Sequence, residues 1–235
     1  MSSRPDHDPY APPSAPVGGM ADDASPTAEH LEGPPLLTIW TRPRSTIRTL
    51  VDLRPAHGAI PLAGASGFGG ALAQLLQGKP AEELSLGGAL GLAAFIGPIA
   101  GILVLYVAAA VVRMTGGWLG GRATVEEARA AWAWGSVPNL ATTAVMIGSL
   151  LAFGPAFFLP DRNAPPDPNL ALVIGFVLTL YLWGFILTLK CLGEVQRFSA
   201  LTAFASVLLA FLMAVAVAVV VALILIAGGG LPAGG

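Results

Sequence analysis

Few residues in this chain have types and spacing that could do chemistry. His7 stands between Asp6 and Asp8, and His30 follows Glu29, but neither pair has the spacing of a metal site. No serine, histidine and acidic residue can be placed together in an apolar stretch, so a hydrolytic site is not indicated. The sequence therefore predicts a protein that is not an enzyme, with no catalytic residues, cofactor or metal.

A glycine-rich turn before a helix is a second place to look for chemistry. Gly120-Gly121-Arg122 lacks the lysine and serine of a phosphate-binding loop, so nucleotide binding is not expected. Thr124 followed three residues later by Glu127 forms a capping-box pattern. We expect a helix to begin there and to continue into the apolar stretch that follows.

Polar residues inside the apolar stretches offer a candidate polar seam, made of Pro138, Asn139, Thr142 and Thr143. Proline leaves a carbonyl one turn back without its donor, and Asn139 could satisfy such a group. Hydroxyls and amides at membrane depth usually bond to backbone or to neighbouring helices. The functional alternative is that these residues line a path for a small neutral solute. No charged residue lies within a predicted span, and this absence disfavours a charge-coupled pump.

The elements that hold these residues are apolar and long. Charged residues make up 11% of the 235 residues and hydrophobic residues 54%, with a mean hydropathy of +0.72; soluble proteins carry roughly 25% charged residues. A helix needs about 20 apolar residues to cross a bilayer. The sequence predicts an all-α membrane protein, a bundle of five transmembrane helices at approximately 58–77, 86–112, 132–153, 170–189 and 201–227. The glycines of the first segment leave open a re-entrant form.

Charge predicts the orientation. Five spans place ten of the twelve Lys and Arg residues on one face and leave only Lys79 and Arg162 on the other. Because basic residues stay preferentially on the cytoplasmic side, the N-terminus is expected in the cytoplasm and the C-terminus outside. The proline-rich residues 1–35 are predicted to be a disordered cytoplasmic tail, and residues 228–235 a short tail on the non-cytoplasmic side.

Residues 36–55 are predicted to form an amphipathic juxtamembrane arm. Ile47, Leu50 and Val51 share one face of a short helix, which Thr41 could cap, and such a helix could lie at headgroup level. Basic residues of this arm and of the later cytoplasmic segments could contact anionic lipid or a protein partner. These candidate cytoplasmic contacts are Arg42, Arg44, Arg48, Arg122 and Arg129.

Small residues at four-residue spacing are candidates for helix packing. Such stripes let helix backbones approach closely, either within one chain or between chains in a complex or homo-oligomer. They comprise Gly87 with Gly91, Gly97 with Gly101, and Ala210, Ala214, Ala218 and Ala222. Cys191 is the single cysteine, so no internal disulfide can form, and its place at a span end is open to palmitoylation, although an unmodified interfacial thiol is favoured.

Three stretches resemble the Yip domain family of Ypt-interacting proteins: Trp40-Thr41-Arg42-Pro43, the Gly120 to Thr124 turn leading to Pro138, and Trp183 to Glu194 leading to Ser199 and Ala203. The resemblance covers roughly residues 36 to 227 and implies five spans with a cytoplasmic N-terminus. Eukaryotic members bind Rab-type GTPases and each other in membrane traffic. Here the Asp-Leu-Tyr-Gly-Pro signature is missing and Asp52-Leu53-Arg54-Pro55 does not replace it, so binding of a Rab-type GTPase is not expected.

The resemblance and the residues together predict an interaction protein. An alanine- and glycine-rich chain with short outer loops looks like a prokaryotic member of the family in the bacterial inner membrane. We expect a non-enzymatic scaffold that associates with membrane lipid, other membrane proteins or copies of itself, and not with nucleic acid. The alternative is a transporter or channel for a small neutral solute.

Overall fold

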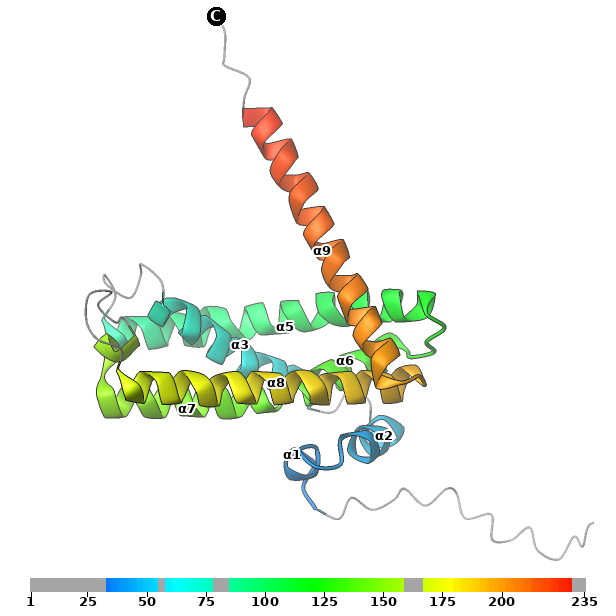
Figure 1. Cartoon of the computed structure of the whole chain (residues 1–235), viewed down its shortest axis with the longest axis horizontal. Coiled ribbons are helices and arrows are strands. Elements are labelled where there is room, and N and C mark those ends of the chain that lie inside the picture. Colours follow the sequence, from blue (N-terminus) through cyan, green and yellow to red (C-terminus); the bar gives the residue numbers. More distant parts are fainter. Residues whose placement is uncertain (1–32, 55–57, 78–84, 159–166, 230–235) are drawn as a thin grey trace, which may run out of the picture. The chain divides into compact units, whose positions relative to one another are not determined.

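The computed structural model describes residues 33–54, 58–77, 85–158 and 167–229, and these residues are helical except at turns and caps (Figure 1). Five helical segments within these ranges are long and apolar enough to cross a membrane, which confirms the predicted fold class. Most of the predicted tail lies outside the described residues, and only its last three positions, 33–35, are described. Lys79 and Arg162 also lie outside the described residues. The helices are α1 (Pro35–Thr38), α2 (Pro43–Leu53), α3 (Ala59–Gln77), α5 (Leu86–Trp118), α6 (Val125–Gly135), α7 (Pro138–Phe153), the 3-10 turn η2 (Pro155–Phe158), α8 (Pro168–Gln196) and α9 (Ala200–Gly229).

The spanning helices are longer than the charge-free segments predicted. Helix α5 continues past Arg113 to Trp118, and α8 continues past Lys190 to Gln196. A charged side chain at the end of a span does not stop a helix, because its long stem can reach the water while the backbone hydrogen bonds continue. Charge therefore marked the membrane-embedded part of each helix and not its end.

The first candidate span is a continuous helix over Ala59–Gln77. Helix α3 packs against α5 along a glycine contact formed by Gly67, Gly97 and Gly101. A Cβ atom on Gly67 would lie 2.6 Å from the Gly101 Cα atom, and one on Gly97 would lie 2.5 Å from the Phe68 Cα atom. Gly67, one of the glycines that weakened the helix prediction, is thus the residue of α3 that lets the two backbones meet.

The third span is divided into α6 and α7 at Ser136 and Val137. Pro138 begins α7, and the Val137 amide donates to the Trp134 carbonyl at 3.3 Å instead of to Ala133. The Ser136 hydroxyl donates to the Ala133 carbonyl at 2.8 Å. The Val137 amide thus takes the Trp134 carbonyl that Pro138 leaves without a donor, and the Ser136 hydroxyl takes the Ala133 carbonyl, whereas the Asn139 side chain forms neither bond.

Helix α2 packs on the protein. Ile47 is fully buried and Leu50 is 7% exposed, and both belong to one core cluster with Cys191 and Leu192 of α8. The predicted apolar face of the arm exists, but it covers α8 and α6 and is not free to enter lipid. Arg42, not Thr41, stands at the N-cap of α2, and Pro43 occupies its first turn.

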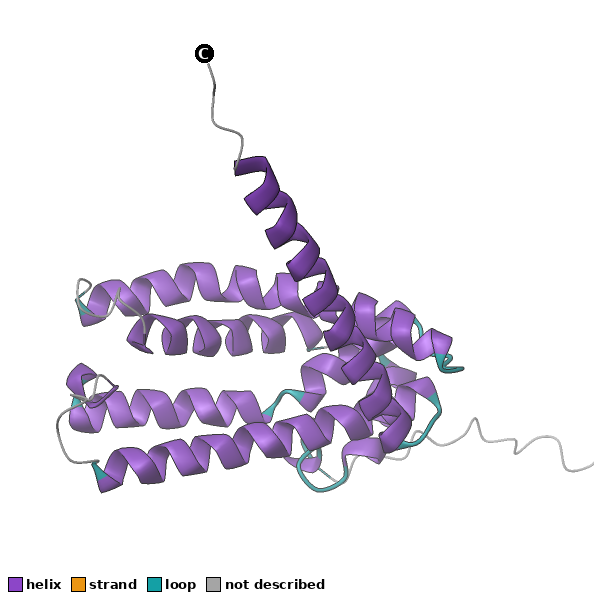
Figure 2. Ribbon diagram, turned by 45° about the horizontal axis from the view of Figure 1, so that its top comes forward, coloured by secondary structure: helices purple, strands orange, loops and turns teal. Residues whose placement is uncertain are grey.

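Helix α9 contacts the other helices only near its start. Ala203, Ser206 and Ala210 are buried against α5 and α8, whereas the residues from Ala214 to Ile226 are exposed. Figure 2 shows the rest of α9 leaving its neighbours.

Candidate functional site

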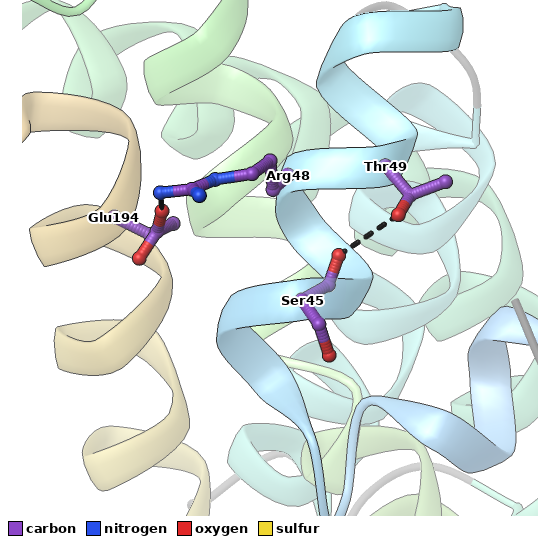
Figure 3. Close-up of polar contacts among 4 residues, drawn as sticks. All are labelled: Ser45, Arg48, Thr49 and Glu194. Carbon is purple, nitrogen blue, oxygen red and sulfur yellow. Dashed lines mark hydrogen bonds and ion pairs between the residues drawn. The ribbon is translucent and has the colours of Figure 1, made fainter. Parts of the chain in front are cut away.

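The contact between α2 and the C-terminal turns of α8 is the candidate site, and we call it the α2 junction. Arg48 of α2 forms an ion pair with Glu194 of α8 (Figure 3), with the Arg48 side chain 69% exposed and that of Glu194 14% exposed. A pair this exposed contributes at most about 1 kcal/mol, so burial of Ile47 and Leu50 dominates the docking of α2. The Thr49 hydroxyl donates to the Ser45 carbonyl at 3.0 Å, which satisfies it within α2.

Cys191 lies beneath this junction. Its Sγ atom is 3.9 Å from the Pro43 carbonyl oxygen, and the residue is fully buried. The structure therefore corrects the expectation of an interfacial thiol, because α2 covers the position. While α2 is docked, the thiol is closed to palmitoylation.

A cavity of about 640 Å³ opens at the α2 junction and carries charges of both signs. Arg48 and Glu194 pair across it, and the Glu127 carboxylate accepts a hydrogen bond from the Thr124 amide. The described residues offer no ion-pair partner to the other three charged residues of its lining, which are Arg44, Asp52 and Arg197. The cavity thus presents two cationic groups and one carboxylate to a molecule outside the chain.

The five predicted cytoplasmic contacts differ in their surroundings. Arg44 and Arg48 line the cavity, while the Arg129 guanidinium lies 4.8 Å from the Tyr106 ring centroid and 3.8 Å from Glu126. Arg122 is exposed and its amide donates to the Gln196 carbonyl at 3.3 Å, and Arg42 caps α2.

Arg197 is a cavity residue that sequence reasoning missed. It has φ 61° directly after α8, in the left-handed conformation that ends many helices. In the sequence, Arg197 is an arginine that follows a long apolar helix. Arginines at the membrane boundary commonly have this position, so the sequence does not mark Arg197 as a cavity residue.

A buried glutamine joins the helix ends beside the junction. The Gln196 side chain donates to the Val112 carbonyl at 3.3 Å and accepts from the Ala123 amide at 3.4 Å. The Ser206 hydroxyl of α9 also donates to that carbonyl at 3.3 Å, and the Thr115 hydroxyl of α5 donates to the Ser206 carbonyl at 3.0 Å. Helices α5, α8 and α9 and the turn before α6 are therefore held by one polar cluster.

The turn between α5 and α6 fits around that glutamine. A Cβ atom on either Gly116 or Gly121 would overlap the Gln196 side-chain amide. The predicted capping box is confirmed, with the Thr124 hydroxyl accepting from the Glu127 amide at 3.2 Å. Gly116 and Gly121 therefore make room for Gln196.

The two threonine hydroxyls of the candidate polar seam bond within their own helix. The Thr142 hydroxyl donates to the Pro138 carbonyl at 3.3 Å and the Thr143 hydroxyl to the Asn139 carbonyl at 2.9 Å. Thr143 also packs against Gly69 of α3. Asn139 lines a cavity between α3, α5 and the α6–α7 break, which the other three residues do not line. Among the described residues no cluster of His, Cys, Asp or Glu could hold a metal, and His7 and His30 lie outside them.

The small-residue stripes divide between packed and open positions. Gly97 and Gly101 contact α3, and Ala210 is buried. In contrast, a Cβ atom on Gly87 or Gly91 would meet nothing within 4 Å. The remaining members of the stripe on α9, which are Ala214, Ala218 and Ala222, are exposed.

These features define an all-helical membrane protein with five candidate spans and a short helix docked at one end. The chain belongs to the Yip1 domain family, whose model matches residues 37–224. This is a non-enzymatic family of membrane traffic. No curated protein and no solved structure matches the chain. The three stretches that carry the resemblance meet near the α2 junction. Pro43 of the first stretch contacts Cys191 of the third. Gly121 of the second stretch contacts Gln196, which lies two residues after Glu194.

Proposed function

We propose that this Yip1-domain protein acts as a membrane scaffold that associates through the α2 junction with a membrane-protein partner or with lipid headgroups. The observation that carries the proposal is the cavity of about 640 Å³ in which Arg44, Arg197 and Asp52 lack partners among the described residues. Charged groups that are held in place but not neutralised favour a ligand of complementary charge.

The proposed location is the cytoplasmic face of a bacterial inner membrane. Five spans with ten of the twelve basic residues on one face support an N-terminus in the cytoplasm and a C-terminus outside. The α2 junction would then face the cytoplasm. Rab-type GTPases are not part of the proposal, since the eukaryotic signature is missing next to α2.

Crosslinking in native membranes tests the α2 junction. A photo-crosslinking residue replaces Val125, which is 40% exposed two residues before Glu127 of the cavity. Exchanging both unpaired arginines in Arg44→Glu/Arg197→Glu should reduce the captured partner or lipid at least fivefold, because the attraction becomes repulsion.

The matched control is Arg54→Glu, which changes an exposed arginine directly after α2 that does not line the cavity. Capture through the control variant should equal that of the unaltered chain. Equal capture through the double variant would show that the junction does not hold the partner.

The transporter alternative has less support. Two of its seam hydroxyls bond to backbone carbonyls and do not line the cavity that Asn139 lines. If a neutral solute passed here, Asn139→Ala should abolish its flux into vesicles without loss of folded protein.

A further inference from the structure

A second cavity lies within the membrane-spanning helices, between α3, α5 and the α6–α7 break. Its volume is about 650 Å³, within the range of roughly 300–1,000 Å³ that is usual for small-molecule sites. Gly70, Ala71 and Ala100 line it, so its width comes from small residues on the facing helices. We call it the α3–α5 groove.

Asn139 supplies the groove with an amide that has no hydrogen-bond partner among the described residues. Its backbone amide donates to the Ser136 carbonyl at 2.9 Å, but its half-buried side chain takes part in none of the bonds found there. The neighbouring Ser136 hydroxyl is already committed to Ala133. An amide left unpaired in hydrocarbon costs a few kcal/mol, so an occupant with a carbonyl or hydroxyl oxygen would be favoured.

The groove opens sideways to the exterior of the helices. On its α5 rim, Leu92 is 37% exposed, Ile96 48% and Val104 57%. In a membrane-spanning segment such apolar side chains contact lipid chains. An occupant that enters past them comes from the bilayer and not from water, which favours a lipid over a polar solute.

We infer that the α3–α5 groove binds one hydrocarbon chain of a membrane lipid and that the Asn139 amide donates a hydrogen bond to an oxygen atom of that lipid. The small residues of α3 and α5 accommodate the chain, and Asn139 fixes its position. This inference does not depend on the α2 junction, whose cavity is lined by different residues, several of them charged.

A phospholipid carrying a diazirine on its acyl chain tests the site. The full chain is reconstituted in phospholipid vesicles that contain this probe, and the adducts formed on illumination are mapped to peptides. Adducts should concentrate on the groove residues of α3 and α5. Gly70→Leu should reduce them at least fivefold, because the new side chain fills the groove while its Cβ atom meets nothing within 4 Å.

Gly87→Leu is the matched control, since its Cβ atom is equally free but the residue does not line the groove. Adducts in the control should equal those of the unaltered chain. Asn139→Leu keeps a similar size but removes the amide, and loss of one hydrogen bond should weaken retention of the probe about fivefold. Thermal unfolding of each variant verifies that it remains folded.

Three outcomes would overturn the inference. One is equal labelling of the groove in the Gly70 and Gly87 variants. Another is an even spread of adducts over the exposed faces of α8 and α9, which would indicate bulk lipid only. The third is capture of a second copy of the chain on the groove rim in place of lipid, as judged by dimer formation from a photo-crosslinking residue at Ile96.

Discussion

Gln196 is the residue on which the helix ends depend most directly. It is 1% exposed and hydrogen-bonds to α5 and to the turn before α6, while Arg122 donates to its backbone carbonyl. A buried amide that loses its partners costs the free energy of its desolvation, about 1–3 kcal/mol. The residues around Gln196 must therefore both form hydrogen bonds with its side-chain amide and be small enough to accommodate it.

Gly116→Ala should destabilise the protein, because the added methyl group overlaps the Gln196 side-chain amide. We expect a loss of about 1–3 kcal/mol in the free energy of unfolding, as is usual for overpacking. Unfolding in mixed micelles at increasing concentrations of a denaturing detergent measures it. Gly117→Ala is the control: its Cβ atom meets nothing within 4 Å, so it should be neutral or stabilise α5 by up to about 1 kcal/mol. Equal stabilities of the two variants would contradict the role assigned to Gln196.

Individual side-chain interactions could be predicted where the two partner residues lie close together in the sequence. Thr124 and Glu127 are three residues apart, and their capping box could be predicted. Gln196 and Val112 are 84 residues apart, so nothing in the sequence joins them. Asn139 was expected to satisfy backbone groups freed by Pro138, but the Trp134 carbonyl, which loses its donor to Pro138, accepts from the Val137 backbone amide instead.

At the scale of helices, α3 and α5 form the closest pair, and α2 forms a separate unit docked on α8. Helix α3 meets α5 backbone to backbone at Gly67, Gly97 and Gly101. Helix α2 is held by burial of Ile47 and Leu50 with an exposed ion pair beside them. The first contact has no flexible side chain that could yield, whereas the second can open as a unit.

Gly101→Ala should disrupt the α3–α5 pair more than a substitution elsewhere on α5. Its Cβ atom would overlap the backbone of Ala63 and Gly67, so we expect a loss of at least about 3 kcal/mol, the upper end of overpacking effects. The same detergent titration, followed by helix content, measures the loss. Gly91→Ala on α5 meets nothing within 4 Å and should be tolerated. The close contact would be disproved by a Gly101 variant as stable as the Gly91 variant.

Release of α2 should expose the single thiol. In the unaltered chain a membrane-permeant maleimide should label Cys191 slowly, because the residue is fully buried beneath Pro43. Ile47→Asp places a charge in the buried face, and loss of a buried isoleucine alone costs about 2–5 kcal/mol. Labelling should therefore rise at least tenfold.

Leu53→Asp is the control for that experiment, because Leu53 lies on the same helix and is 61% exposed. It should leave the labelling rate unchanged. Fast labelling of the unaltered chain would mean that α2 does not cover the thiol.

The sequence predicted the helices well and their ends less well. Uncharged segments located all five spans, because the membrane excludes charge from its interior. The break at Ser136 and Val137 was visible only as a proline, and the burial of α2 depends on α8, more than 130 residues away in the chain. Amphipathic helices present the same pattern whether they face lipid or protein.

At the scale of the whole molecule, we expect the five candidate spans to place the two ends of the chain on opposite sides of the membrane. In a Cys191→Ala background, a cysteine introduced at Ser2 should be labelled only from the cytoplasmic side by an impermeant maleimide. A cysteine at Gly235 should be labelled only from the other side. Labelling of both positions from one side would require an even number of crossings and would exclude α3 as a span.

The contact between α3 and α5 also bears on how the chain enters the membrane. Helix α3 is, with the third span, among the least apolar of the candidate spans, whereas α5 is strongly apolar. A weakly apolar segment partitions poorly into lipid on its own. We expect the insertion machinery to retain α3 until α5 has been synthesised, so that the two leave for the bilayer as a hairpin already joined through Gly67, Gly97 and Gly101.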